Sequence, residues 1–203
     1  RDYYASRGLG DVYKRQLETE AALAARNGGT PIPAYAFQHI IVPDIYDAMD
    51  IVPSSEKKNG AVEGYGCRKG TYYSAASVIE AGTLGEAPCP PDQNGGEFDA
   101  WKQGGDIVAG FFGHDHVNDY AGTYKGIRLL AAPAVTFYSY GNYRGVRTID
   151  LDESNLTTFQ TQVIPADKLM DYTVKNPYIR EHGYYEYKLS LIHISEPTRR
   201  VVI

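Results

Sequence analysis

The sequence predicts an α/β protein in which metal-binding side chains follow buried strands. Residues 107–112 form a run of six apolar or small residues without polar alternation, which indicates a strand covered on both faces. A helix-forming segment at 17–26 precedes a short strand at 34–40. Helices and buried strands in one chain are typical of layered α/β folds, which bind ligands at the carboxyl ends of their strands.

The first half of the chain begins with the helix at 17–26. This helix should end at Asn27-Gly28, because glycine readily adopts the left-handed conformation that closes a helix. The strand at 34–40 ends near His39, and Pro43 can open another helix. Residues 51–96 are dense in Gly, Pro, Ser and Lys, and we expect a long loop that shapes the mouth of a substrate site.

The second half should contain one helix and several strands. Asn94 and Glu97 are spaced as a capping box, ahead of a helix whose Phe98 and Trp101 share one face and which Gly104-Gly105 closes. Strands are predicted at 107–112, 123–130, 145–151 and 157–164.

The motif with the most chemical content is Gly113-His114-Asp115-His116, directly after the buried strand. In an extended segment residues i and i+2 point to the same side, so both imidazoles could face one metal site while Asp115 faces away. Gly113 would provide the sharp turn. Asp115 and Asp119 are candidates to orient an imidazole through its second nitrogen. The alternatives are ordinary loop histidines, and aspartates that serve in turns or caps.

Four segments occur in an order that resembles one enzyme family. They are Phe37-Gln38-His39-Ile40-Ile41-Val42-Pro43-Asp44-Ile45-Tyr46, Asn94-Gly95-Gly96-Glu97-Phe98-Asp99, Gly113-His114-Asp115-His116 and Arg144-Gly145-Val146-Arg147. Together they resemble the C-terminal half of a calcineurin-like metallophosphoesterase of the purple acid phosphatase-like branch. The resemblance implies an α/β fold, namely a fragment of the four-layer α/β/β/α sandwich of metal-dependent phosphatases.

The same resemblance implies the site and the reaction. His39 and His114 would bind one metal ion and His116 a second, with Asn94 at the rim of the substrate pocket and Asp119 behind the ligands. Two divalent ions, Fe, Zn or Mn, would assist hydrolysis of a small phosphate ester. By itself, His39 would more often be a core or strand-end histidine than a metal ligand. For Asn94, helix capping is the more common role. Arg144 and Arg147 flank the start of a strand, where a phosphate contact is conceivable, but arginines at strand ends are usually solvated or paired on the surface.

The upstream part of the family pattern is missing from this sequence. Nothing before His39 reads as D-x-H, G-D-x-x-D or G-N-H-E. We therefore expect a fragment, residues 17–187, that alone has little or no catalytic activity. Residues 1–16 and 188–203 resemble translated adapter sequence and are predicted to be a non-native leader and tail, although a genuine arm and terminal strand are the alternative.

Composition narrows the possible partners. The chain carries 20 Lys and Arg against 25 Asp and Glu, a net charge of −5, which argues against nonspecific nucleic-acid binding. No apolar run is long enough to predict a transmembrane helix, so no membrane partner is expected. Cys67 and Cys89 could pair in an exported protein or stay free in a cytosolic one. The sequence leaves the compartment, the oligomeric state and the natural substrate undetermined.

Two other functions are compatible with these residues. One is another metallohydrolase that uses the H-x-H loop, although a metallo-β-lactamase type would need H-x-H-x-D-H, and Asn118-Asp119 occupy the last two places. The other is a noncatalytic binding module, for which 18 tyrosines and many glycine loops would be suitable.

Overall fold

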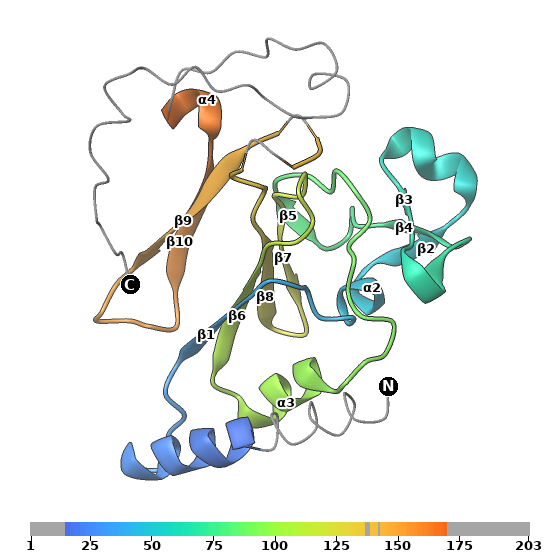
Figure 1. Cartoon of the computed structure of the whole chain (residues 1–203). Helices are drawn as coiled ribbons and strands as arrows, with labels where there is room; N and C mark the ends of the chain where they lie inside the picture. The colour runs from blue at the N-terminus through green and yellow to red at the C-terminus, as the bar shows by residue number, and fades with distance from the viewer. Residues whose placement is uncertain (1–14, 137–138, 142, 170–203) are drawn as a thin grey trace.

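A five-stranded mixed sheet forms the centre of the protein (Figure 1). The structure is a computed structural model that describes residues 15–136, 139–141 and 143–169. The strand order is β1-β6-β8-β7-β5, and β6 pairs in parallel with both of its neighbours. The bounds are β1 Ala34–Gln38, β5 Ile79–Ala81, β6 Ile107–Phe112, β7 Ala121–Tyr124 and β8 Ile127–Ala131. The α/β class and the buried strand at 107–112 are confirmed.

Alternation along β6 divides the core between the two faces of this sheet. Phe112 packs with Trp101 in the larger cluster, on the side of α2 (Ile45–Ala48) and α3 (Glu97–Gly104). Phe111 faces the opposite side, where Phe159 contacts it from a ribbon of β9 (Gly145–Leu151) and β10 (Phe159–Pro165). Within the described residues the layers are therefore helices, main sheet and a two-stranded sheet. The short α4 (Ala166–Leu169) follows β10.

The predicted first helix and its end are present. Residues 15–26 are helical, and the Gly29 N–H donates to the Ala24 carbonyl at 2.8 Å while Gly28 has a φ of 67°. This is the closure expected of a left-handed glycine after a helix. Most of the predicted non-native leader (residues 1–14) and the whole predicted tail at 188–203 lie outside the described residues.

The single strand predicted at 123–130 is wrong. Residues 121–131 form a hairpin of β7 and β8, and the turn falls at Lys125 and Gly126, with φ values of 45° and 85°. Two successive positive φ angles give the turn that joins antiparallel strands with the correct twist. A lysine in the first of these positions is unusual, so the sequence carried only the glycine as a signal.

The long loop predicted at 51–96 is also wrong in part. A small three-stranded sheet of order β2-β4-β3 occupies this region, and β5 joins the main sheet. The elements around the small sheet are, in chain order, β2 Asp50–Val52, the 3-10 helix η1 Ser54–Asn59, β3 Val62–Glu63, the 3-10 helix η2 Gly66–Arg68 and β4 Tyr72–Ser74. Buried Tyr73 and Tyr46 meet edge to face at 4.7 Å, which anchors this sheet to the core.

The predicted helix at 97–104 is confirmed, but its start differs from a capping box. Gly96, with a φ of 81°, is the N-cap residue of α3, and no side chain caps the helix. Phe98 and Trp101 are each 1% exposed and Gly105 closes the helix in a left-handed conformation, as expected. Among the described residues, no helix has the length and apolar character needed to cross a membrane. Cys67 and Cys89 are both free thiols.

Candidate metal centre

His39 and His114 meet at the carboxyl ends of two neighbouring strands. His39 follows β1 and His114 follows β6, and the parallel pairing of these strands places both ends at one edge of the sheet. The His114 Nδ1 atom lies 3.0 Å from His39 Nε2, and the rings are nearly perpendicular, with centroids 4.8 Å apart. The Gly113 N–H also donates to the His39 carbonyl at 3.1 Å. The structure therefore brings together two of the three predicted ligands, which are 75 positions apart.

The loop that carries both histidines is a turn, not an extended segment. His114 itself adopts a φ of 59°, and the Asp115 N–H donates to the Gly113 carbonyl at 2.7 Å. The prediction that i and i+2 alternation aims both imidazoles the same way is therefore wrong in its premise. The residue with the left-handed backbone conformation is His114 and not the glycine before it. Residues other than glycine rarely adopt this conformation, so the surrounding structure holds His114 in it.

His116 lies against Tyr140. The centroids of the two rings are 4.3 Å apart at an interplanar angle of 31°. The Nδ1 atom of His116 is buried and has no hydrogen-bond partner among the described residues. Burial lowers the pKa of this imidazole; the charge of Glu86 opposes this effect, while the charges of Arg144, His114 and His39 add to it. His116 is thus favoured in the neutral form that metal ions bind.

Asp115 is buried and hydrogen-bonded to the segment around Cys89. Its carboxylate accepts a hydrogen bond of 3.1 Å from the Cys89 N–H, and the residue is only 3% exposed. Burial raises the pKa of Asp115 to about 7, and the nearby charge of Glu86 adds to this effect. Asp115 therefore ties the histidine loop to the chain segment around Cys89.

The other two predicted site residues have structural partners. Both carboxylate oxygens of Asp119 accept hydrogen bonds, from the Thr83 N–H at 2.6 Å and from the Tyr143 hydroxyl at 2.9 Å. Asn94 donates to Asp44 at 3.0 Å and accepts from the Gly96 N–H at 2.9 Å. Asn94 thus links the start of α2 to the start of α3, and it is not among the residues that line the groove next to His39.

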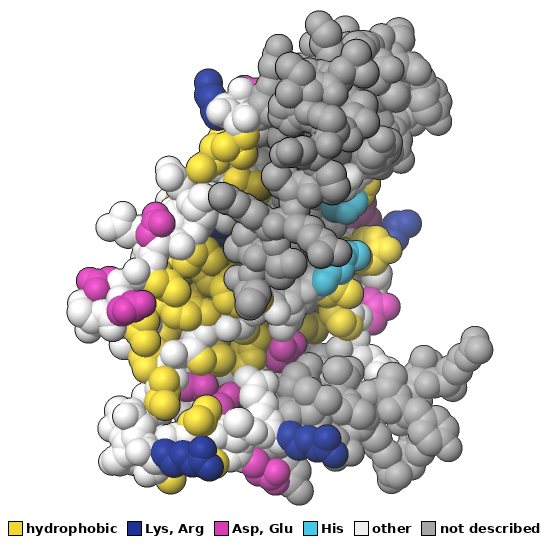
Figure 2. Space-filling view, turned by 60° about the vertical axis from the view of Figure 1, so that its left-hand side comes forward, with side chains coloured by type: hydrophobic (Ala, Val, Ile, Leu, Met, Phe, Trp, Pro, Cys, Tyr) yellow, Lys and Arg dark blue, Asp and Glu magenta, His cyan; other side chains and the backbone are white. Residues whose placement is uncertain are grey.

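A groove of about 490 Å³ lies next to His39, between the main sheet and the β9–β10 ribbon. Phe37, Phe111 and Ile149 give it apolar walls, and Phe37 is 66% exposed. Figure 2 shows histidine side chains at the surface of a face that also carries a hydrophobic area. Among the described residues, His39 is exposed and His114 is partly buried.

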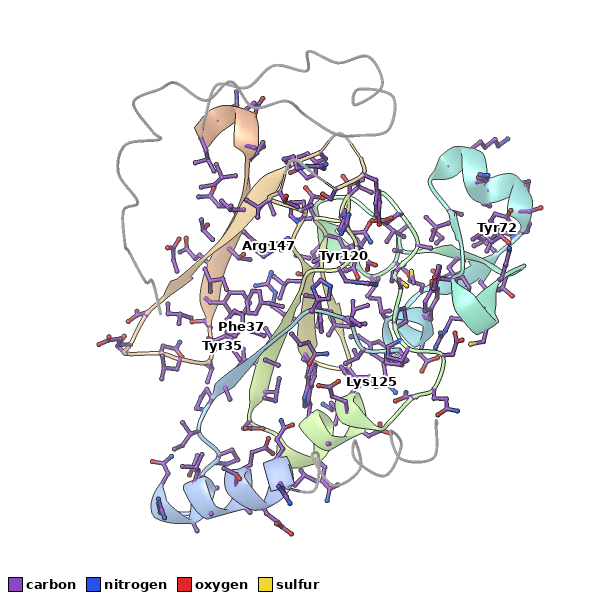
Figure 3. All side chains as sticks on the ribbon, viewed as in Figure 1. Tyr35, Phe37, Tyr72, Tyr120, Lys125 and Arg147 are labelled. Carbon is purple, nitrogen blue, oxygen red and sulfur yellow. The ribbon has the colours of Figure 1, made fainter. Side chains whose placement is uncertain are left out.

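Arg144 and Arg147 are engaged in the interior, so the expectation of surface arginines is wrong. Arg147, labelled in Figure 3, donates to the carbonyls of Ala131 and Asp119 and so joins the ribbon to the main sheet. Arg144 is 1% exposed and donates to the carbonyls of Tyr143 and Ser139. These contacts engage both arginines with backbone carbonyls, and Arg147, which is partly buried, also lines the groove next to His39.

The His39–His114 pair fits one metal ion, whereas the set of donors for a dinuclear site is incomplete. Two nitrogens bound at about 2.1 Å to one metal ion lie roughly 3.4 Å apart in tetrahedral geometry and roughly 3.0 Å apart at a right angle, so the 3.0 Å between His39 and His114 matches the right-angled arrangement. The same distance suits a hydrogen bond between neutral imidazoles. Within the part of the chain that is described, no group of three or more His, Cys, Asp or Glu side chains is arranged to hold a metal ion.

Sequence reasoning missed three residues that shape this loop. Asn118 is fully buried and accepts from the N–H groups of Gly85 and Glu86 at 2.8 and 2.9 Å. Glu86 in turn accepts from Tyr140. Glu86 is 31 positions from Val117, whose N–H it binds, so local patterns carried no signal of these contacts.

Comparison with known proteins gives limited similarity. No protein-family model and no solved structure matches the chain. The chain is similar to the probable inactive purple acid phosphatase 14 of Arabidopsis thaliana, with 33% identity over 80 residues. These residues make up 39% of this chain and 20% of that protein, so the chain matches about a fifth of the curated relative. This short similarity weakly supports the resemblance to purple acid phosphatase-like proteins.

Proposed function

We propose that this chain is part of a metal-dependent phosphoesterase whose intact parent hydrolyses small phosphate esters at a dinuclear site. The observation that carries the proposal is the 3.0 Å approach of the His39 and His114 nitrogens at the carboxyl ends of two parallel strands. Neighbouring strand ends are where α/β sheets place their ligands. The short similarity to a purple acid phosphatase-like protein supports the same assignment.

In this proposal each histidine has a defined task. His39 and His114 hold one ion of Fe, Zn or Mn, and His116 contributes to the second. When bound, such ions activate water and neutralise charge on the phosphoryl group. The protein's own contribution is to keep the imidazoles neutral, to fix the loop through Asp115, and to offer the open groove next to His39.

We further propose that this polypeptide alone has little or no activity. Two facing imidazoles are too few donors for a dinuclear site, and among the described residues no group of three or more His, Cys, Asp or Glu side chains is arranged to hold a metal ion. The relative is itself named a probable inactive phosphatase. The shortage of metal donors also favours the second candidate function, a noncatalytic binding module.

Metal binding and turnover can be measured separately on the 203-residue chain. We expect Zn²⁺ or Mn²⁺ to raise the melting temperature, because an ion that binds only the folded state stabilises it. His39→Ala and His114→Ala should abolish the shift. His193→Ala, in the predicted tail, is the matched control and should retain it. A shift that persists in both His39→Ala and His114→Ala would overturn the metal assignment.

Hydrolysis of an aryl phosphate tests the second half of the proposal. We expect no turnover above background with either metal. Robust turnover that His116→Ala abolishes would overturn the inactivity of the isolated chain and support the enzyme assignment. No metal-dependent stabilisation and no turnover together would favour the binding module.

A further inference from the structure

We propose that Tyr140 and Glu86 are positioning residues that hold His116 in its orientation for metal binding. The inference rests on the proposed function and extends it to two residues on separate loops. Neither of them is a metal ligand in this proposal, since both act through contacts with the histidine and its loop.

The first contact is ring against ring. Tyr140 covers the imidazole of His116 at a centroid distance of 4.3 Å, with the planes inclined by 31°. Because the buried Nδ1 atom of His116 has no partner among the described residues, this packing restrains the ring where a hydrogen bond does not.

The second contact fixes Tyr140 itself. Its hydroxyl donates to Glu86 Oε2 at 2.7 Å, while Glu86 Oε1 accepts from the Val117 N–H at 3.2 Å. One carboxylate therefore bonds both the backbone directly after His116 and the ring that covers it. Such a charge-assisted pair of bonds is stronger than two neutral ones.

A third residue holds Glu86 in place. Asn118 accepts from the Glu86 N–H at 2.9 Å and donates to the Glu86 carbonyl at 3.1 Å. The ring contact and these hydrogen bonds therefore join His116, Tyr140, Glu86 and Asn118 in one network. Two of its members, His116 and Asn118, belong to the histidine loop. Residues behind a metal ligand typically change metal affinity by 10- to 100-fold when they are removed.

Four variants of the full chain test the proposal. Tyr140→Leu removes the ring, Tyr140→Phe keeps the ring without its hydroxyl, and Glu86→Gln removes the charged acceptor. Tyr72→Leu is the matched control, because Tyr72 lies in β4 of the small sheet, where it pairs with Val52 and Glu63 (Figure 3). The readouts are the NMR signals of the His116 ring protons, assigned with His116→Asn, and the affinity for Zn²⁺.

Tyr140→Leu should shift the His116 ring signals, because the ring current of the tyrosine is lost, and should weaken Zn²⁺ binding by about 10-fold or more. Tyr140→Phe should retain most of the ring-current effect and lose less affinity. Glu86→Gln combined with Tyr140→Phe should lose little more than Tyr140→Phe alone, since both remove the same contact. Tyr72→Leu should change neither readout.

The outcomes separate this inference from the proposed function. Unchanged His116 signals and unchanged Zn²⁺ affinity in Tyr140→Leu would overturn the positioning role. Absence of Zn²⁺ binding in the unmodified chain would overturn the proposed function. In that case a shift of the His116 signals in Tyr140→Leu, restored in Tyr140→Phe, would still support the restraint of this ring by Tyr140.

Discussion

Replacement of Asn118 should destabilise the protein by an amount that the structure defines. The side chain is fully buried and makes three hydrogen bonds to the backbone of Gly85 and Glu86, two as acceptor and one as donor. At about 1 kcal/mol for each bond, Asn118→Leu should lower the free energy of unfolding by about 3 kcal/mol. Leucine keeps the branched shape of asparagine and leaves no cavity, but it is larger, so strain from overpacking at this fully buried site adds to the loss.

Urea unfolding followed by the fluorescence of Trp101, which is 1% exposed and the only tryptophan, measures this loss. The melting temperature should fall by roughly 2–4 °C for each kcal/mol in a chain of this size. Gln93→Leu is the control, because Gln93 is exposed and a surface change of this kind usually stays within about 0.5 kcal/mol. A loss in Asn118→Leu no larger than that of the control would refute the reasoning.

Three further predictions concern other parts of the fold. Because the pKa of Asp115 is raised to about 7, the folded state binds one more proton than the unfolded state between about pH 4 and 7. The free energy of unfolding should therefore fall as the pH rises through this window, by up to about 1.4 kcal/mol per pH unit. Asp115→Asn should flatten this pH dependence, which urea unfolding at pH 5 and pH 8 measures. Lys125→Asn, ahead of Gly126, should raise the melting temperature in calorimetry, since asparagine tolerates the φ of 45° better; an unchanged or lower value would contradict the turn assignment. Phe37→Ser should reduce concentration-dependent association in sedimentation experiments, because it removes an exposed ring that stacks on Phe111 at 4.9 Å; equal association of both proteins would exclude this patch as the cause.

Local patterns were reliable where a single element determined the outcome. The apolar run at 107–112 became β6 with the same bounds, and Phe98 and Trp101 face the core from α3. Local patterns were misleading where the backbone conformation departed from the usual preference of the residue type. Lys125 and His114 both adopt positive φ values that their residue types rarely show, so the hairpin and the true shape of the histidine loop were not apparent.

The sequence by itself determined that residues 107–112 form a buried strand, where two helices end, and that two histidines follow this strand. These properties depend on neighbouring residues and therefore leave a local pattern. Only the tertiary structure decided which groups share the site. The parallel pairing of β1 with β6 joins His39 to His114, and long-range contacts bring Glu86 and Tyr140 to the loop of His116. Contacts between residues 30 or more positions apart arise from packing of the whole sheet, which no short stretch of residues encodes.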